Sequence, residues 1–125
     1  MLQVSSEVGR LRRVLVHEPG LEVDRMAPAM MEELLFDDIL FGERAREEHR
    51  RFRRLLQLLG VEVVEALDLL SCALEEEGAT SWLWGAMRSE VPAPLRERLR
   101  RLDPDALAEV MVAGLLPGDE TPGSA

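Results

Sequence analysis

The first residues that could do chemistry are two adjacent aspartates, Asp37 and Asp38, in the stretch EELLFDDILFG at 32–42. Large apolar residues flank the pair on both sides, and charged groups are rarely buried unless a partner compensates them. Paired carboxylates match the planar fork of a guanidinium, so the pair could hold a cation of that type. The alternative is a polar turn in which one aspartate caps a helix that begins around 40–43.

A thiol and two imidazoles are the other reactive groups. Cys72 could be a nucleophile with His17 or His49 as its base. Its neighbours are mostly Leu and Ala in a helical stretch, which favours a small buried hydrophobe. We expect His49 on the packed face of a helix with one hydrogen bond, and His17 in the turn after a strand. These three side chains match no metal-ligand spacing, and no glycine-rich phosphate loop is present, so we expect no metal and no cofactor.

The elements that must position these groups begin with a strand, a helix and a second strand. Residues 10–17 predict a strand buried on both faces. Residues 43–59 predict a helix, because apolar side chains recur there at steps of three and four, and Gly60 follows as its stop. The stretch VEVVEAL at 61–67 predicts a second strand, parallel to the first. A short helix near 28–35 would deliver the two aspartates at its carboxyl end.

The character becomes helical from residue 68 onward. Asp68, Ser81 and Asp103 are candidate helix caps, and Pro94 fits the first turn of another helix. Trp82 and Trp84 fall two residues apart in this region, and we expect both to pack, on different faces. The last stretch, LPGDETPGSA, is rich in Pro, Gly and small polar residues, which predicts a flexible tail.

Composition limits the possible partners and the compartment. The chain has 125 residues, 46% hydrophobic and 31% charged, with a net charge of −9 and arginine as its basic residue throughout. This acidity argues against nucleic acid, and the run RRFRRLL at 50–56 reads as a solvated helix face. No apolar run approaches the roughly 20 residues of a membrane span. We see no signal peptide and no possible internal disulfide, so we expect a cytoplasmic protein with no membrane partner.

Taken in order, several segments resemble the beginning of the arginine deiminases, a family of the guanidino-group-modifying or pentein superfamily. The similarity runs from SSEVGRLRRVLVHEPG at 5–20 through MEELLFDDI at 31–39 and AREEHRRF at 45–52. It continues through LGVEVVEALDLL at 59–70 to LRRLDPDALAEVMVAGL at 99–115. Each motif alone is weak, whereas the ordered set is specific.

The resemblance implies an α/β fold. Residues 1–70 would form one strand–helix–strand unit of a pentein-type α/β propeller. Residues 71–116 would form an α-helical insertion segment, and 117–125 the flexible tail.

The resemblance also implies a reaction. In this family a cysteine thiolate attacks the guanidinium carbon of L-arginine, ammonia leaves, and water releases L-citrulline, with a histidine as acid and base. The substrate-binding residues carried over are Leu35, Phe36, Asp37 and Asp38. Leu35 would pack against the aliphatic part of arginine. The two acids would add negative potential near the cation or pair with a cationic residue outside this chain.

The catalytic motifs of the family are missing from these residues. The chain has no Asn-x-x-Phe-Thr-Arg-Asp, His-x-Asp or Gly-Gly-His-Cys segment, and Cys72 lies in a different region. We therefore expect the N-terminal portion of an arginine deiminase-like hydrolase, inactive alone, with no catalytic residue. It would meet L-arginine only when completed by a C-terminal part. The alternative is a non-catalytic protein-interaction module, and in either case exposed strand edges favour self-association.

Overall fold

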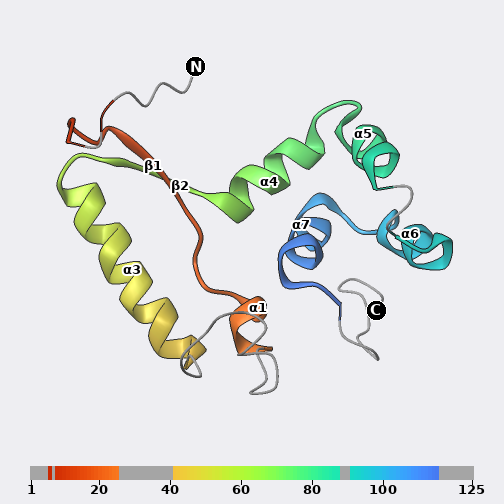
Figure 1. The fold of residues 1–125 in the computed structure, drawn as a ribbon, viewed down its shortest axis with the longest axis horizontal. Coiled ribbons are helices and arrows are strands. Elements are labelled where there is room, and N and C mark those ends of the chain that lie inside the picture. Colours follow the sequence, from red (N-terminus) through yellow and green to blue (C-terminus); the bar gives the residue numbers. More distant parts are fainter. Residues whose placement is uncertain (1–5, 7, 26–40, 88–90, 116–125) are drawn as a thin grey trace.

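A computed structural model describes residue 6 and residues 8–25, 41–87 and 91–115 (Figure 1). Its elements in chain order are β1 (Arg13–Val16), α1 (Leu21–Asp24), α3 (Gly42–Leu58), β2 (Glu62–Glu65), α4 (Ala66–Glu75), α5 (Ala79–Ala86), α6 (Ala93–Leu99) and α7 (Pro104–Ala113). The helix predicted near 28–35, the aspartate pair and the tail at 117–125 fall outside the described residues.

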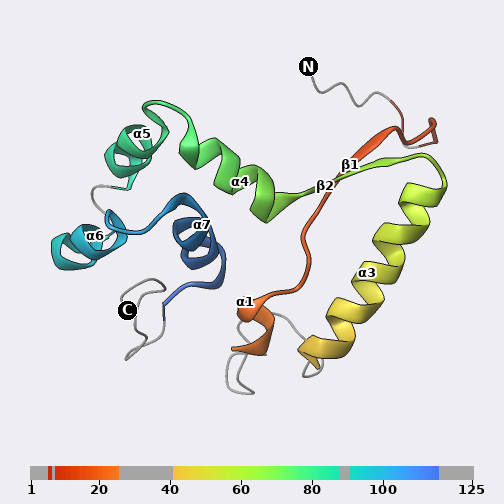
Figure 2. The same ribbon diagram turned by 180° about the vertical axis from the view of Figure 1, so that it is seen from behind.

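The two strands pair in parallel, as the sequence predicts. Val14 lies opposite Val63 and Leu15 opposite Val64. Helix α3 makes the connection and lies to one side of the pair, while α4, α5, α6 and α7 gather on the other (Figures 1 and 2). An α/β class with a small parallel sheet is therefore confirmed, and the propeller unit remains a prediction.

Helix α3 matches its predicted range to within one residue at each end. Ion pairs one turn apart, Arg44 with Glu48 and Glu47 with Arg51, support its exposed side. Gly60 follows with a φ of +77°, a left-handed conformation that glycine adopts without strain, and the chain turns there into β2.

The predicted apolar stripe of α3 is only partly covered. His49 is half-buried, as expected for the packed side. Phe52, Leu55 and Leu59 are instead exposed, at 52%, 54% and 65%. The sheet has only two short strands in the described residues, so it covers part of this stripe and leaves the rest in solvent.

The expectation that the first strand is buried on both faces is wrong. Leu15 is 60% exposed, and Arg13 on the same face pairs with Glu62 at 2.6 Å, both side chains lying mostly in solvent. A parallel sheet normally has both faces covered. In the described part of the chain, no helix or strand covers the sheet face that carries Arg13 and Leu15.

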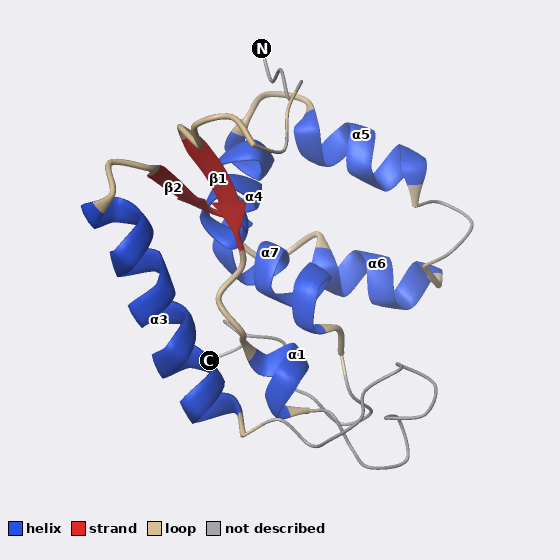
Figure 3. Cartoon of the chain, turned by 60° about the vertical axis from the view of Figure 1, so that its left-hand side comes forward, coloured by secondary structure: helices blue, strands red, loops and turns tan. Residues whose placement is uncertain are grey.

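The hydrophobic core lies in the helical segment. Figure 3 shows the helices of this segment, α4 to α7, gathered beside the strand pair. Its buried members come from α4, α5, α6 and α7: Leu74, Leu83, Trp84, Leu99, Leu107, Ala108 and Val110. The predicted cap of α7 is confirmed, because Asp103 Oδ1 accepts a hydrogen bond from the Ala106 N–H at 2.8 Å. Two other starts were misplaced, since α4 begins directly after β2 at Ala66 and α5 begins at Ala79, after Gly78.

The tryptophan prediction is half right. Trp84 is buried at 8% exposure and packs in the core, whereas Trp82 is 75% exposed. Two residues on a helix are 200° apart, so only one of the two can face the core.

Candidate functional site

The carboxyl ends of the two strands bring together the most concentrated set of polar side chains in the described residues. His17 and Glu18 follow β1 directly, and Glu65 is the last residue of β2, paired in register with Val16. Binding sites in open α/β sheets lie outside the carboxyl ends of the strands. This end of the sheet is therefore the candidate functional site.

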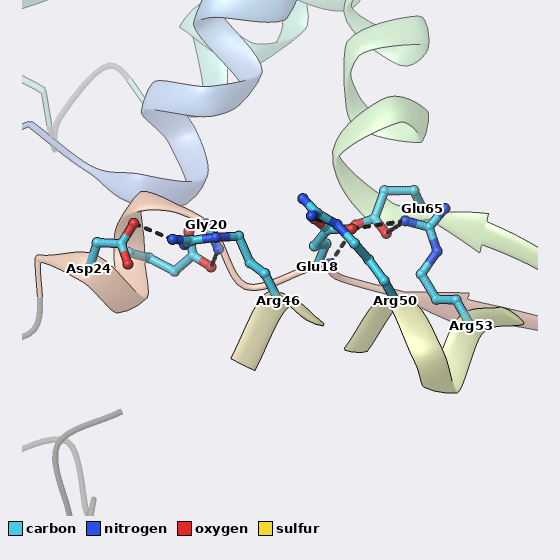
Figure 4. A network of polar contacts seen from close by, with 8 residues as sticks. Glu18, Gly20, Asp24, Arg46, Arg50, Arg53 and Glu65 are labelled. Atoms are coloured by element: carbon cyan, nitrogen blue, oxygen red, sulfur yellow. Dashed lines mark hydrogen bonds and ion pairs between the residues drawn. The ribbon is translucent and has the colours of Figure 1, made fainter. Parts of the chain in front are cut away.

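Glu65 is the buried centre of this cluster, with a side chain only 9% exposed (Figure 4). Its Oε1 accepts a hydrogen bond from the Glu18 backbone N–H at 2.9 Å, and His17 Nδ1 lies 3.4 Å away. Its Oε2 lies 3.4 Å from Arg53 Nη1 and accepts no hydrogen bond in the described structure. A buried carboxylate needs such compensation, and the guanidinium of α3 supplies it.

Glu18, which follows β1, also pairs with arginines of α3. Arg50 donates to Glu18 Oε1 through Nε at 2.8 Å, with its Nη2 at 2.6 Å, and Arg53 Nη1 lies 3.3 Å from Oε2. The hydrogen bond from Arg50 is the main reason that the pKa of Glu18 is lowered, against a smaller opposing effect of burial. Arg53 thus sits between two carboxylates, and α3 is tied to both strand ends.

A second carboxylate organises the turn after β1. Glu22 Oε1 accepts a hydrogen bond from the Gly20 N–H at 2.6 Å, and His17 Nε2 lies 3.0 Å away. Burial raises the pKa of Glu22, but backbone hydrogen bonds and His17 outweigh it, so the pKa is lowered overall. His17 therefore bridges the carboxylates of Glu22 and Glu65.

An ion pair between Asp24 and Arg46 lies near both ends of the segment that carries the predicted substrate residues. That segment leaves the described structure after Arg25 and returns at Phe41. Arg46 Nη1 donates to Asp24 Oδ2 at 2.9 Å, joining α1 to α3 beside both ends (Figure 4).

Gly42 permits the close approach of these two helices. It is the buried first residue of α3, and a Cβ built there would overlap the Asp24 carboxylate severely. The predicted residues Leu35, Phe36, Asp37 and Asp38 lie outside the described residues, so their positions stay a prediction.

The prediction that Cys72 is buried is wrong. Cys72 is exposed on α4, and its neighbour Ser71 faces inward and donates a hydrogen bond to Asp105 of α7. Successive residues of a helix point about 100° apart, so Ser71 lies on the buried side of α4 and Cys72 on its exposed side. The predicted hydrogen bond of His49 is also not found, because its buried Nε2 has no partner in the described structure. No hydrogen bond joins Cys72 to either histidine within the described ranges.

Sequence reasoning missed the cluster of Glu18, Glu65, Arg50 and Arg53. The available signal in the sequence was a glutamate at the end of each strand motif, in VHEPG and in VEVVE. Every acid in this cluster already has a cationic or N–H partner, so the cluster recognises a guanidinium of its own chain. Over the described residues, no group of three or more His, Cys, Asp or Glu could hold a metal ion. Nor does that part of the chain contain a helix long and apolar enough to cross a membrane.

The chain has clear relatives. The family model for arginine deiminase matches residues 32–102, which include the aspartate pair, α3, β2 and most of the helical segment. The chain is 40% identical over 126 aligned residues to a protein named arginine deiminase from Mycobacterium tuberculosis (strain ATCC 25618 / H37Rv), covering 92% of this chain and 31% of that protein. Identity is 40% to the protein of that name from Rhodococcus erythropolis (91% and 30% covered) and 42% to that from Mycobacterium avium (94% and 32%). The chain thus spans about a third of the length of the curated relatives it matches.

Proposed function

Because this chain belongs to the arginine deiminase family, we propose that it is the N-terminal portion of a hydrolase that converts L-arginine and water to L-citrulline and ammonia. The observation that carries this proposal is the match over residues 32–102, which begins at the segment with the aspartate pair. The strand–helix–strand part would be one unit of a pentein-type propeller, and α4–α7 the helical insertion.

The proposed role of the chain is to supply one wall of the substrate pocket. Leu35 and Phe36 would contact the aliphatic part of arginine, and Asp37 and Asp38 would face its guanidinium or a cationic residue of the completing part. The Asp24–Arg46 pair supports this role, because it fixes the two ends of the segment on the same scaffold. Holding the two ends of a chain segment close together lowers the entropy cost of closing the loop between them.

We assign no catalytic residue to this chain. Attack on a guanidinium is slow without a thiolate, a proton-transferring histidine and carboxylates held together around it. Cys72 is exposed on α4, and His17 is already engaged by two glutamates. The nucleophile, the acid–base histidine and their partners would come from outside these 125 residues.

The test is complementation. The 125-residue chain is purified alone and with the C-terminal two thirds of the Rhodococcus erythropolis relative, and citrulline is measured. We expect none from the chain alone and release from the pair. In the active pair, Asp38→Ala should raise the KM for arginine at least tenfold, whereas Asp119→Ala, a matched change in the tail, should leave it unchanged. Citrulline made by the lone chain and abolished by Cys72→Ser would overturn the assignment.

A second candidate function is a non-catalytic module that binds a partner protein. The exposed Leu15 of β1 and the exposed apolar side chains of α3 favour it. Reading the DNA beyond the codon for Ala125 separates the two candidates. A frame encoding Phe-Thr-Arg-Asp and Gly-Gly-His-Cys supports the deiminase, and an unrelated gene supports the module.

A further inference from the structure

A hollow of about 480 Å³ between α5 and α6 is lined by cationic and hydroxyl groups. Its walls are Ser81, Trp84 and Gly85 from α5, Arg96 from α6, and Arg100, the residue that follows α6. The helices α5 and α6 belong to the helical segment and lie away from the strand ends (Figure 1). We propose that this hollow binds the phosphate group of a small phosphate monoester or of inorganic phosphate, a site beyond the proposed deiminase function.

Two positive charges lie close together at this hollow. Arg96 on α6 and Arg100 at the carboxyl-terminal cap of the helix are one helical turn apart, a spacing at which like charges repel each other. Arg96 is half-buried and has no carboxylate partner in the described structure. The chain carries a net charge of −9, so carboxylates to neutralise it are plentiful elsewhere. An anion in the hollow would compensate both guanidinium groups.

Arg100 is already held in place beside the hollow. Arg100 lies over the Trp84 ring, with Cζ 5.8 Å from the ring centroid, and Trp84 is itself fixed in the core. The other partner of Arg100 is Glu97, at 3.1 Å in an exposed pair that contributes little. Across the hollow, Ser81 offers a hydroxyl, and a Cβ at Gly85 would meet nothing within 4 Å, which leaves room for a ligand.

The identity of the anion follows from the count of charges and donors. Two guanidinium groups carry two positive charges, and a phosphate monoester carries about −1.5 to −2 near pH 7 with three acceptor oxygens. A monocarboxylate has only two acceptor oxygens, fewer than the two guanidinium groups and the Ser81 hydroxyl can engage. Trp84 is buried and Arg100 lies over its ring, so this ring is not open to stack with a ring of the ligand. The phosphate group is therefore the recognised part.

The test is a titration of the 125-residue chain with inorganic phosphate and, separately, glycerol 3-phosphate at constant ionic strength. Trp84 fluorescence is followed in a Trp82→Phe background, and the thermal midpoint is measured in parallel. We expect saturable binding that Arg96→Gln and Arg100→Gln each weaken at least tenfold. Arg101→Gln removes the same charge just after α6 and should change nothing.

The two ligands distinguish the source of the phosphate. Tighter binding of glycerol 3-phosphate supports a monoester, and equal binding supports phosphate itself. Equal losses in Arg96→Gln and Arg101→Gln would overturn the site, because the effect would then be unspecific attraction. Binding of acetate as tightly as phosphate would overturn the assignment of the anion. If Arg100→Gln unfolds the chain, the test rests on Arg96→Gln. Phosphate should then raise the thermal midpoint of the wild-type chain but not that of Arg96→Gln, and an equal rise in both would overturn the site.

Discussion

Arg53→Met should destabilise the chain far more than the same change at any exposed arginine of α3. Methionine keeps most of the aliphatic stem and removes the guanidinium that lies between Glu18 and Glu65. Glu65 then keeps the Glu18 N–H and the neighbouring His17 as its partners, while its Oε2 loses the cation 3.4 Å away. The result is a buried carboxylate with half of its compensation removed.

The expected cost follows from the exposure of the two partners. At an effective dielectric constant of about 20, two unit charges 3.4 Å apart attract by roughly 5 kcal/mol, an upper bound because desolvation opposes it. Breaking fully buried pairs costs about 3–5 kcal/mol, and exposed pairs contribute about 0.2–1 kcal/mol. Glu65 is 9% exposed and Arg53 27%, so the pair falls between these classes. We expect Arg53→Met to lower the free energy of unfolding by about 1.5–3 kcal/mol.

Urea unfolding at pH 7, followed by circular dichroism, measures this cost. The matched control is Arg51→Met, whose pair with Glu47 has side chains 73% and 62% exposed and should cost about 0.5 kcal/mol or less. A double-mutant cycle with Glu65→Gln should recover at least half of the Arg53→Met effect, because the buried charge is then gone. Equal costs for Arg53→Met and Arg51→Met would refute the reasoning and place Glu65 in water.

Two further predictions concern the same end of the sheet. Gly42→Ala should lower the thermal midpoint in the wild-type chain, because the new methyl group displaces the Asp24 carboxylate from Arg46. The same change should raise the thermal midpoint in an Asp24→Ala background, where only the higher helix propensity of alanine remains. Equal shifts in both backgrounds would show that the two helices do not meet there. The pKa of Glu18 is lowered in the fold, chiefly by the hydrogen bond from Arg50, so its contribution to stability is present above its ordinary value of 4.5 and is lost as the pH falls through the folded value. Arg50→Met should therefore flatten the loss of stability below pH 4.5 in an acid titration, and an unchanged acid limb would contradict the assignment.

The elements with strong local patterns were predictable from sequence. Helix α3 was placed within one residue at each end, because helix formers run unbroken to Gly60. The four-residue helix α1 was not predicted, since Leu21–Asp24 is too short for any period. The start of α4 was misplaced by a few residues, because VEVVEAL reads equally well as strand or as strand followed directly by helix.

Burial was predicted less well than secondary structure, for a physical reason. Periodicity identifies the apolar side of a helix, but whether anything covers that side depends on distant parts of the chain. Phe52 and Leu55 have the pattern of core residues and are exposed, and Cys72, expected to be buried because of its Leu and Ala neighbours, is exposed as well. Ser71 is buried because Asp105, 34 residues further on, accepts its hydrogen bond.

The candidate site was the least predictable feature. Arg50 meets Glu18 across 32 residues, and Glu65 meets the Glu18 N–H across 47. No local spacing encodes such pairs, which follow only from the parallel register of the strands and the path of α3. The aspartate pair was identified by its charges within an apolar run, and the resemblance to a family gave it a role, whereas only the structure brought the residues of the cluster together.

The two parts of the chain are held together by different forces, and this bears on how the proposed pocket wall would form. The helical segment has the apolar core, while the strand–helix–strand part has ion pairs and a half-covered sheet, with Leu15 and Leu55 in solvent. Partly exposed ion pairs contribute little each, so the strand–helix–strand part should open first. A completing chain that covered these exposed side chains would stabilise that part selectively, by about 25 cal/mol for each Å² of apolar surface removed from water. The Asp24–Arg46 ion pair, which joins α1 to α3, lies in that part of the chain, so the completing chain should also make this pair harder to open.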